Sequence, residues 1–97
     1  MSSLMGSIAD NKSGGHVIYR SSKTALNSVV KSLSVDLQND NISVVAIHPG
    51  WVQTDMGGEN APLTPEQSIA GIMNVLKQLS PKDNGCFYNY DGNVIAW

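Results

Sequence analysis

Two long segments of the chain carry hydrophobic residues at helical spacing. In residues 17–38, and again in residues 64–79, apolar side chains recur at intervals of three and four. The second segment opens with Thr64, Pro65 and Gln67, which match a capping box with a proline in the first turn. The pattern predicts two amphipathic helices, with these residues facing inward: Leu26, Val30, Leu33, Leu37, Ile69, Ile72, Met73, Leu76 and Leu79.

Three other stretches have the character of β-strands. Residues 42–47 are almost continuously apolar and β-branched, which is typical of a strand covered on both faces in a parallel sheet. Residues 86–89 look like a shorter strand, and residues 1–8 resemble the tail of an apolar strand followed by a turn of small residues. The order of strand, helix, strand, helix and strand predicts βαβ units with right-handed crossovers, and therefore an α/β fold with a parallel sheet.

This topology brings polar residues from distant parts of the chain to one edge of the sheet. Ser3 and the Pro49-Gly50 pair both follow the carboxyl ends of predicted parallel strands. Open α/β sheets bind their ligands at that edge. We therefore expect Ser3, Tyr19 and the loop after His48 to converge on one site.

Composition narrows the class of protein. The 97 residues suffice for one small domain, and only 14% of them are charged, so much of the surface is expected to be covered. A net charge of -2 with six basic residues does not indicate the basic surface that nucleic-acid binding requires. No long apolar run or signal-peptide pattern is present, and Cys86 is alone, so we expect a soluble, cytoplasmic protein without a membrane span or a disulfide.

One short motif at the start of the first helix suggests chemistry. Tyr19 and Lys23 are four residues apart and share one helix face. An ammonium near a phenol favours the phenolate, which lowers the phenol pKa from about 10 and prepares it for proton transfer. The same spacing also occurs on ordinary helix surfaces, where the pair has no role, so the motif needs supporting context.

Three motifs in order supply that context, because together they resemble the short-chain dehydrogenase/reductase family over essentially the whole chain. They are residues 2–6 (Ser-Ser-Leu-Met-Gly), 19–23 (Tyr-x-x-x-Lys) and 49–54 (Pro-Gly-Trp-Val-Gln-Thr). The finer patterns in residues 48–58 and 89–92 look like the subgroup of C-factor-like and sniffer-like carbonyl reductases.

The resemblance implies the carboxyl-terminal part of a Rossmann-type doubly wound parallel sheet with flanking helices. Residues 1–97 would form the catalytic half of such a domain, because the glycine-rich turn that opens the family's cofactor site has no counterpart in this sequence. The implied activity is that of an NAD(P)H-dependent carbonyl reductase or alcohol dehydrogenase acting on a small carbonyl or alcohol. The alternative is an inactive, truncated interaction or regulatory module. The family commonly dimerises through the helix at 17–38, so the resemblance also implies a homo-oligomer.

The resemblance also implies roles for individual residues. Tyr19 would be the general acid, Lys23 would bind the nicotinamide ribose and lower the Tyr19 pKa, and Ser3 would hydrogen-bond the substrate oxygen. Ser2 and Ser7 remain alternatives to Ser3. Ser7 would be favoured if the number of residues between the serine and Tyr19 had to match the family's usual spacing. The cofactor implied is NADPH rather than NADH, with no metal.

Other roles concern the loop after residue 48. Thr54 would hold the nicotinamide carboxamide with the Val52 backbone, although Thr54 could instead cap a turn. The remaining implied residues are Pro49 and Gly50 against the nicotinamide ring, and Trp51, Met56 and Gly57 at the substrate mouth.

Overall fold

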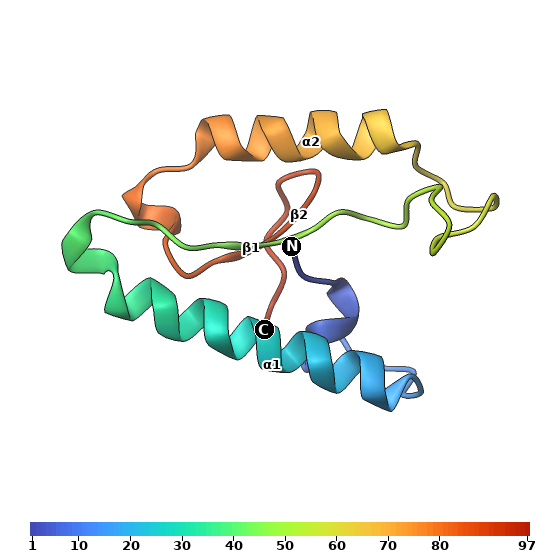
Figure 1. Ribbon diagram of the computed structural model, residues 1–97, viewed down its shortest axis with the longest axis horizontal. Coiled ribbons are helices and arrows are strands. Elements are labelled where there is room, and N and C mark those ends of the chain that lie inside the picture. The colour runs from blue at the N-terminus through green and yellow to red at the C-terminus, as the bar shows by residue number, and fades with distance from the viewer.

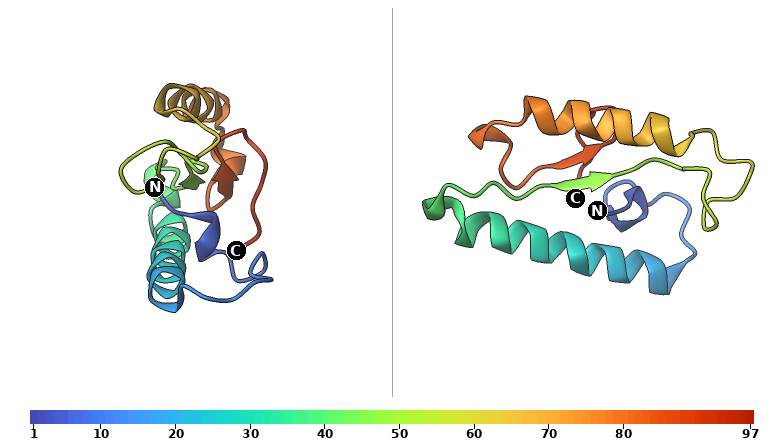
Figure 2. Two further views of the ribbon diagram at one scale, coloured as in Figure 1. Left: turned by 90° about the vertical axis from the view of Figure 1, so that its right-hand side faces the viewer. Right: turned by 45° about the horizontal axis from the view of Figure 1, so that its top comes forward.

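The computed structural model describes residues 1–97 and consists of two α-helices, two short parallel strands and three single-turn helices. The helices are α1 (Val17–Asp36) and α2 (Pro65–Gln78), and the strands are β1 (Ala46–His48) and β2 (Phe87–Asn89). In Figures 1 and 2 the strands run between the two helices and point in the opposite direction to both. This is the βαβ arrangement that the sequence predicts, and the α/β fold class is confirmed.

The two strands pair in parallel, with Ile47 opposite Tyr88. A third extended segment lies on the other side of β1, where the Ser2 backbone N–H donates to the Ile47 carbonyl at 2.8 Å. The Ala46 N–H, one residue earlier, donates to Cys86 on the β2 side at 3.0 Å. The amino-terminal serines therefore lie beside β1, as the predicted order of strands requires.

The apolar core is small and lies between the sheet and α2. It consists of Ile47, Ile72, Val75 and Tyr88. On the other face of β2, Phe87 is buried and its ring stacks on that of Trp97, with centroids 5.3 Å apart. The carboxyl-terminal residues are thereby part of the folded unit.

The predicted strand at 42–47 is wrong at its start, because β1 begins only at Ala46. The Val44 N–H donates to the Asn84 side-chain oxygen at 2.9 Å, and the Asn84 amide donates to the Ser34 carbonyl at 2.7 Å. The Asn84 side chain thus bonds the Val44 N–H, which would otherwise be available to pair with a neighbouring strand. The second strand also begins one residue later than predicted, at Phe87.

The helix boundaries agree more closely with the prediction. The predicted capping box of α2 is confirmed, because the Gln67 N–H donates to the Thr64 hydroxyl at 3.2 Å and the Thr64 N–H to the Gln67 side chain at 2.9 Å. Helix α1 ends at Asp36, two residues before the predicted end, and the chain tightens into the single turn η2 (Gln38–Asp40). Neither helix combines the length and the hydropathy that crossing a membrane would require.

The predicted inward faces are partly wrong. The residues of α2 that are buried are Ser68, Ile72 and Val75. By contrast, Ile69, Met73 and Leu76 are exposed by 58%, 47% and 45%, because the small sheet covers only one side of the helix. On α1, Leu33 is 40% exposed and the buried residues are Asn27 and Ser34.

We expect the isolated chain to self-associate through these exposed apolar residues, since apolar area gains roughly 25 cal/mol per Å² when it is removed from water. Size-exclusion chromatography with light scattering would detect oligomers. Leu33→Lys should shift the population towards monomer, whereas Asn39→Lys, on the exposed turn η2, should not. A monomeric profile with a cooperative thermal melt would contradict this expectation.

The Tyr88–Asp83 pair makes stability depend on pH. The Tyr88 hydroxyl donates to Asp83 Oδ1 at 2.5 Å, and this bond, with those from Ser80, holds the pKa of Asp83 below its ordinary value of 3.8. A lowered carboxyl pKa contributes stability above the unfolded value, and this stability is lost as the pH falls through the folded value.

Tyr88→Phe should therefore destabilise the chain most above about pH 4, with a difference that shrinks at lower pH. Urea melts at a neutral and an acidic pH would measure it, with Tyr90→Phe as the control. A difference between wild type and Tyr88→Phe that stays constant with pH would show that the carboxyl plays no part.

Candidate active site

The turn that follows the two amino-terminal serines packs directly on α1. A Cβ atom at Gly6, the last residue of η1 (Leu4–Gly6), would lie 2.9 Å from the backbone carbon of Lys23 and 2.9 Å from its Cβ. The Thr24 hydroxyl donates to the Gly6 carbonyl at 2.9 Å. Only glycine lets the two backbones approach this closely, so this residue sets how near the serines come to the helix.

Tyr19 and Lys23 occupy the first two turns of α1 and face each other. The Lys23 ammonium lies 5.8 Å from the centre of the Tyr19 ring, within the range of a cation–π contact. Tyr19 is 37% exposed, so part of the residue is in contact with solvent. The predicted juxtaposition of this pair on one helix face is confirmed.

The three candidate serines differ in what their hydroxyls do. Ser7 Oγ donates to the Ala96 carbonyl and accepts from the Asp10 N–H, which ties the two ends of the chain together. Ser2 Oγ donates to the side chain of Asn27. Ser3 Oγ only accepts, from the Met5 N–H at 3.2 Å, so its proton is committed to no partner in the chain.

Asn27 is a residue of this region that sequence reasoning missed. It is buried, its Oδ1 accepts from Ser2, and its Nδ2 is buried without a hydrogen-bond partner. The available signal was its position four residues after Lys23, on the helix face that meets the serine turn. The amide at this position fixes Ser2 and thereby supports its neighbour Ser3.

The loop after β1 is anchored to α2 and folded back on itself. The Ser68 hydroxyl donates to the Pro49 carbonyl at 2.6 Å. Gly50 has a φ of 86°, and a Cβ there would lie 2.9 Å from the Tyr90 ring. Val52 pairs with Leu63 in an isolated parallel bridge. Pro49, Gly50 and Val52 are therefore held at fixed positions just beyond the end of β1.

The side chains in the rest of the loop either bond within the loop or are exposed. The Thr54 hydroxyl accepts from the Gly57 N–H at 3.1 Å, so it caps a turn. The Met56 side chain is 87% exposed. Trp51 Nε1 donates to the Gly57 carbonyl at 2.7 Å, which holds the indole over the loop.

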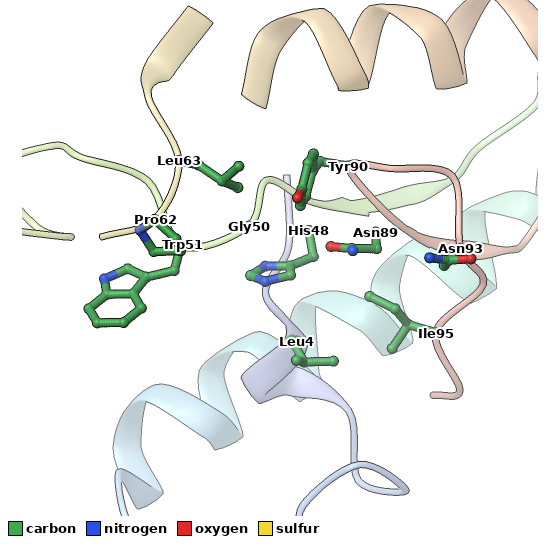
Figure 3. Close-up of a pocket in the computed structure, with 10 residues that line it drawn as sticks. All are labelled: Leu4, His48, Gly50, Trp51, Pro62, Leu63, Asn89, Tyr90, Asn93 and Ile95. Carbon is green, nitrogen blue, oxygen red and sulfur yellow. The ribbon is translucent and has the colours of Figure 1, made fainter. Parts of the chain in front are cut away.

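A cleft of about 370 Å³ opens between this loop, η1 and the chain after β2 (Figure 3). Leu4, the residue after Ser3, and Gly50 and Trp51 share it, so the serine turn and the loop after His48 do converge. Tyr19 and Lys23 do not line the cleft. The other lining residues are His48, Pro62, Leu63, Asn89, Tyr90, Asn93 and Ile95.

The parallel sheet, with a serine turn packed on a helix that carries Tyr-x-x-x-Lys, is part of an α/β fold of the Rossmann type. A family model described as short chain dehydrogenase matches residues 1–63. The chain belongs to the short-chain dehydrogenase family.

The chain is similar to named proteins of this family. It is 45% identical over 97 residues to C-signal of Myxococcus xanthus, matching all of this chain and 58% of the relative. Among solved structures, the carbonyl reductase Sniffer of D. melanogaster superimposes on it with a TM-score of 0.96 and 52% identity, over 100% of this chain and 39% of that one. An NADPH-bound carbonyl reductase from chicken fatty liver superimposes with a TM-score of 0.91 and 43% identity, over 99% of this chain and 40% of that one. The chain therefore spans about half the length of these relatives, or less.

Gly6→Ala should separate the serine turn from α1, because the new methyl group would overlap the Lys23 backbone. We expect a loss of stability of about 1–3 kcal/mol, the usual cost of overpacking. Urea unfolding would measure the loss, and the amide chemical shifts of residues 23–27 would show whether the helix face changes. A variant as stable as the wild type would contradict the close packing.

Proposed function

We propose that this chain carries the catalytic groups of an NADPH-dependent carbonyl reductase, with Tyr19 as the general acid, Lys23 as its partner and Ser3 on the substrate oxygen. The observation that carries the proposal is the docking of the serine turn on the helix that bears Tyr19 and Lys23, through Gly6 and Thr24. This contact joins the segment that carries Ser3 to the helix turn that carries Lys23, which supports a shared site.

Tyr19 is suited to donate a proton to a carbonyl oxygen. It is partly exposed, and the Lys23 ammonium lies 5.8 Å from its ring centre. A positive charge at that position stabilises the tyrosinate left after proton transfer. Lys23 is itself half-buried under the serine turn, so its position is restricted.

Ser3 is the best of the three serines for the substrate oxygen. Ser2 and Ser7 donate their hydroxyl protons to Asn27 and Ala96, whereas the Ser3 proton is uncommitted. A hydroxyl with a free proton can donate to an oxygen on which negative charge develops. Its own oxygen is held in place by the Met5 N–H.

The residues fit the nicotinamide end of a dinucleotide in part. The Lys23 ammonium beside the Tyr19 ring is a donor set suited to ribose hydroxyls, and Pro49, Gly50 and Val52 present an anchored backbone beyond β1. The Thr54 hydroxyl is engaged in its turn, so the carboxamide would be held by the backbone at Val52. A bound nicotinamide supplies the hydride. NADPH rather than NADH is supported by the relative that binds it.

A second candidate function is a non-enzymatic pairing module. The exposed apolar residues Val29 and Leu33 on α1 and Ile69 and Met73 on α2 favour it, and so does the name of the relative C-signal. Such a module would not need the Tyr19 hydroxyl.

The decisive test is NADPH-dependent reduction of a reactive aryl ketone. It should use this chain and also a chimaera that supplies the amino-terminal part of the similar D. melanogaster enzyme. Tyr19→Phe should lower turnover by about 10²–10⁴-fold, the usual contribution of general acid catalysis. Lys23→Met should also lower it, while Lys31→Met, exposed on the same helix, should leave it unchanged.

Equal turnover in wild type and Tyr19→Phe would contradict the proposal. A folded chimaera with no turnover would contradict it as well and would favour the pairing module. Ser3→Ala and Ser2→Ala, compared side by side, would test which serine acts.

A further inference from the structure

His48 lines the cleft together with the polar residues Asn89 and Asn93, and the resemblance gives it no role. His48 is the last residue of β1 and pairs with Asn89 across the sheet. Its imidazole lies between Leu4 below and Tyr90 above, and the Asn89 amide points towards it (Figure 3). His48 and Leu4, the residue that follows Ser3, thus line the same cleft.

The two nitrogens of this imidazole lie in different surroundings. Nδ1 is sealed from solvent and has no hydrogen-bond partner, which leaves Nε2 as the nitrogen open to the cleft. A neutral imidazole carries its proton on one nitrogen and a lone pair on the other. A buried N–H without an acceptor is the rarer and more costly orphan, so the proton belongs on Nε2. His48 then offers a single N–H donor to the cleft.

The rest of the cleft is uncharged. Leu4, Trp51, Leu63 and Ile95 form apolar walls, and no lysine, arginine or carboxylate lines it. Burial lowers the pKa of His48, which keeps the imidazole neutral at neutral pH. A carboxylate or phosphate would lose its water in this cleft without meeting a cation, and that is costly.

We propose that His48 determines substrate specificity by donating its Nε2–H to a neutral acceptor oxygen, so that the cleft takes uncharged carbonyl compounds with a second acceptor besides the reacting group. The apolar walls would hold the body of such a compound. This inference rests on the proposed reductase function, because it places the non-reacting end of the substrate in the cleft beside the serine turn, which Ser3, Tyr19 and Lys23 themselves do not line.

Three matched aryl ketones would test the proposal: the methyl ester of para-acetylbenzoate, para-propylacetophenone and para-acetylbenzoate itself. They offer a neutral acceptor, an apolar group and an anion at the same place. Binding to this chain, followed by NMR with isotopically labelled histidine, should be about three- to tenfold tighter for the ester than for the propyl analogue, and weakest for the anion. The signals of His48 should respond and should report the Nε2-protonated tautomer.

Variants of His48 distinguish the effect of its N–H donor from the effect of its ring. His48→Phe should bring the ester and propyl analogue to equal affinity, and His48→Asn, which keeps a donor, should restore part of the difference. His16→Asn is the control, because His16 is exposed and has a φ of 48°, which asparagine tolerates. In the reducing chimaera, His48→Phe should raise KM for the ester and leave kcat nearly unchanged.

Binding and turnover distinguish the two proposals. Ester-selective binding without reduction in the chimaera would overturn the reductase function and leave the His48 contact standing. Reduction of all three ketones with equal KM, or a His48 protonated on Nδ1, would overturn the role of His48 alone.

Discussion

The close contact between Gly6 and the Lys23 turn of α1 is the constraint on which the site depends. Because residue 6 has no side chain, the serine turn lies against the helix that carries Tyr19 and Lys23. The same segment is tied to β1 through the Ser2 N–H and to the helix through Asn27. One small residue thus couples the sheet edge, the serines and the tyrosine helix.

Polar contacts connect helices and loops that lie outside the small apolar core. Asn84 connects the end of α1 to the segment before β1, and Ser68 connects α2 to the loop after it. These bonds place the loop beyond His48 opposite the serine turn, and the cleft lies between them. The helices meanwhile keep large apolar residues in solvent, which is why a pairing role competes with an enzymatic one.

Local patterns in the sequence predicted the features that depend on local interactions. The capping box at Thr64 and the Tyr19–Lys23 pair are set within one or two helix turns, and both were correct. The start of β1 was missed because the side chain of Asn84, 40 residues away, takes the Val44 N–H. The sequence pattern gave no sign that Asn27 and His48 each bury an unpartnered nitrogen, because only long-range packing shows it.

The most direct test of this account is a nuclear Overhauser measurement between the α-protons of Gly6 and the β-protons of Lys23. A Cβ built on Gly6 would lie 2.9 Å from that of Lys23, so a strong cross-peak is predicted. Its presence would place the serine turn against the Lys23 turn of α1 in solution. Its absence, in a chain whose α1 is folded, would contradict the shared site and with it the reductase proposal.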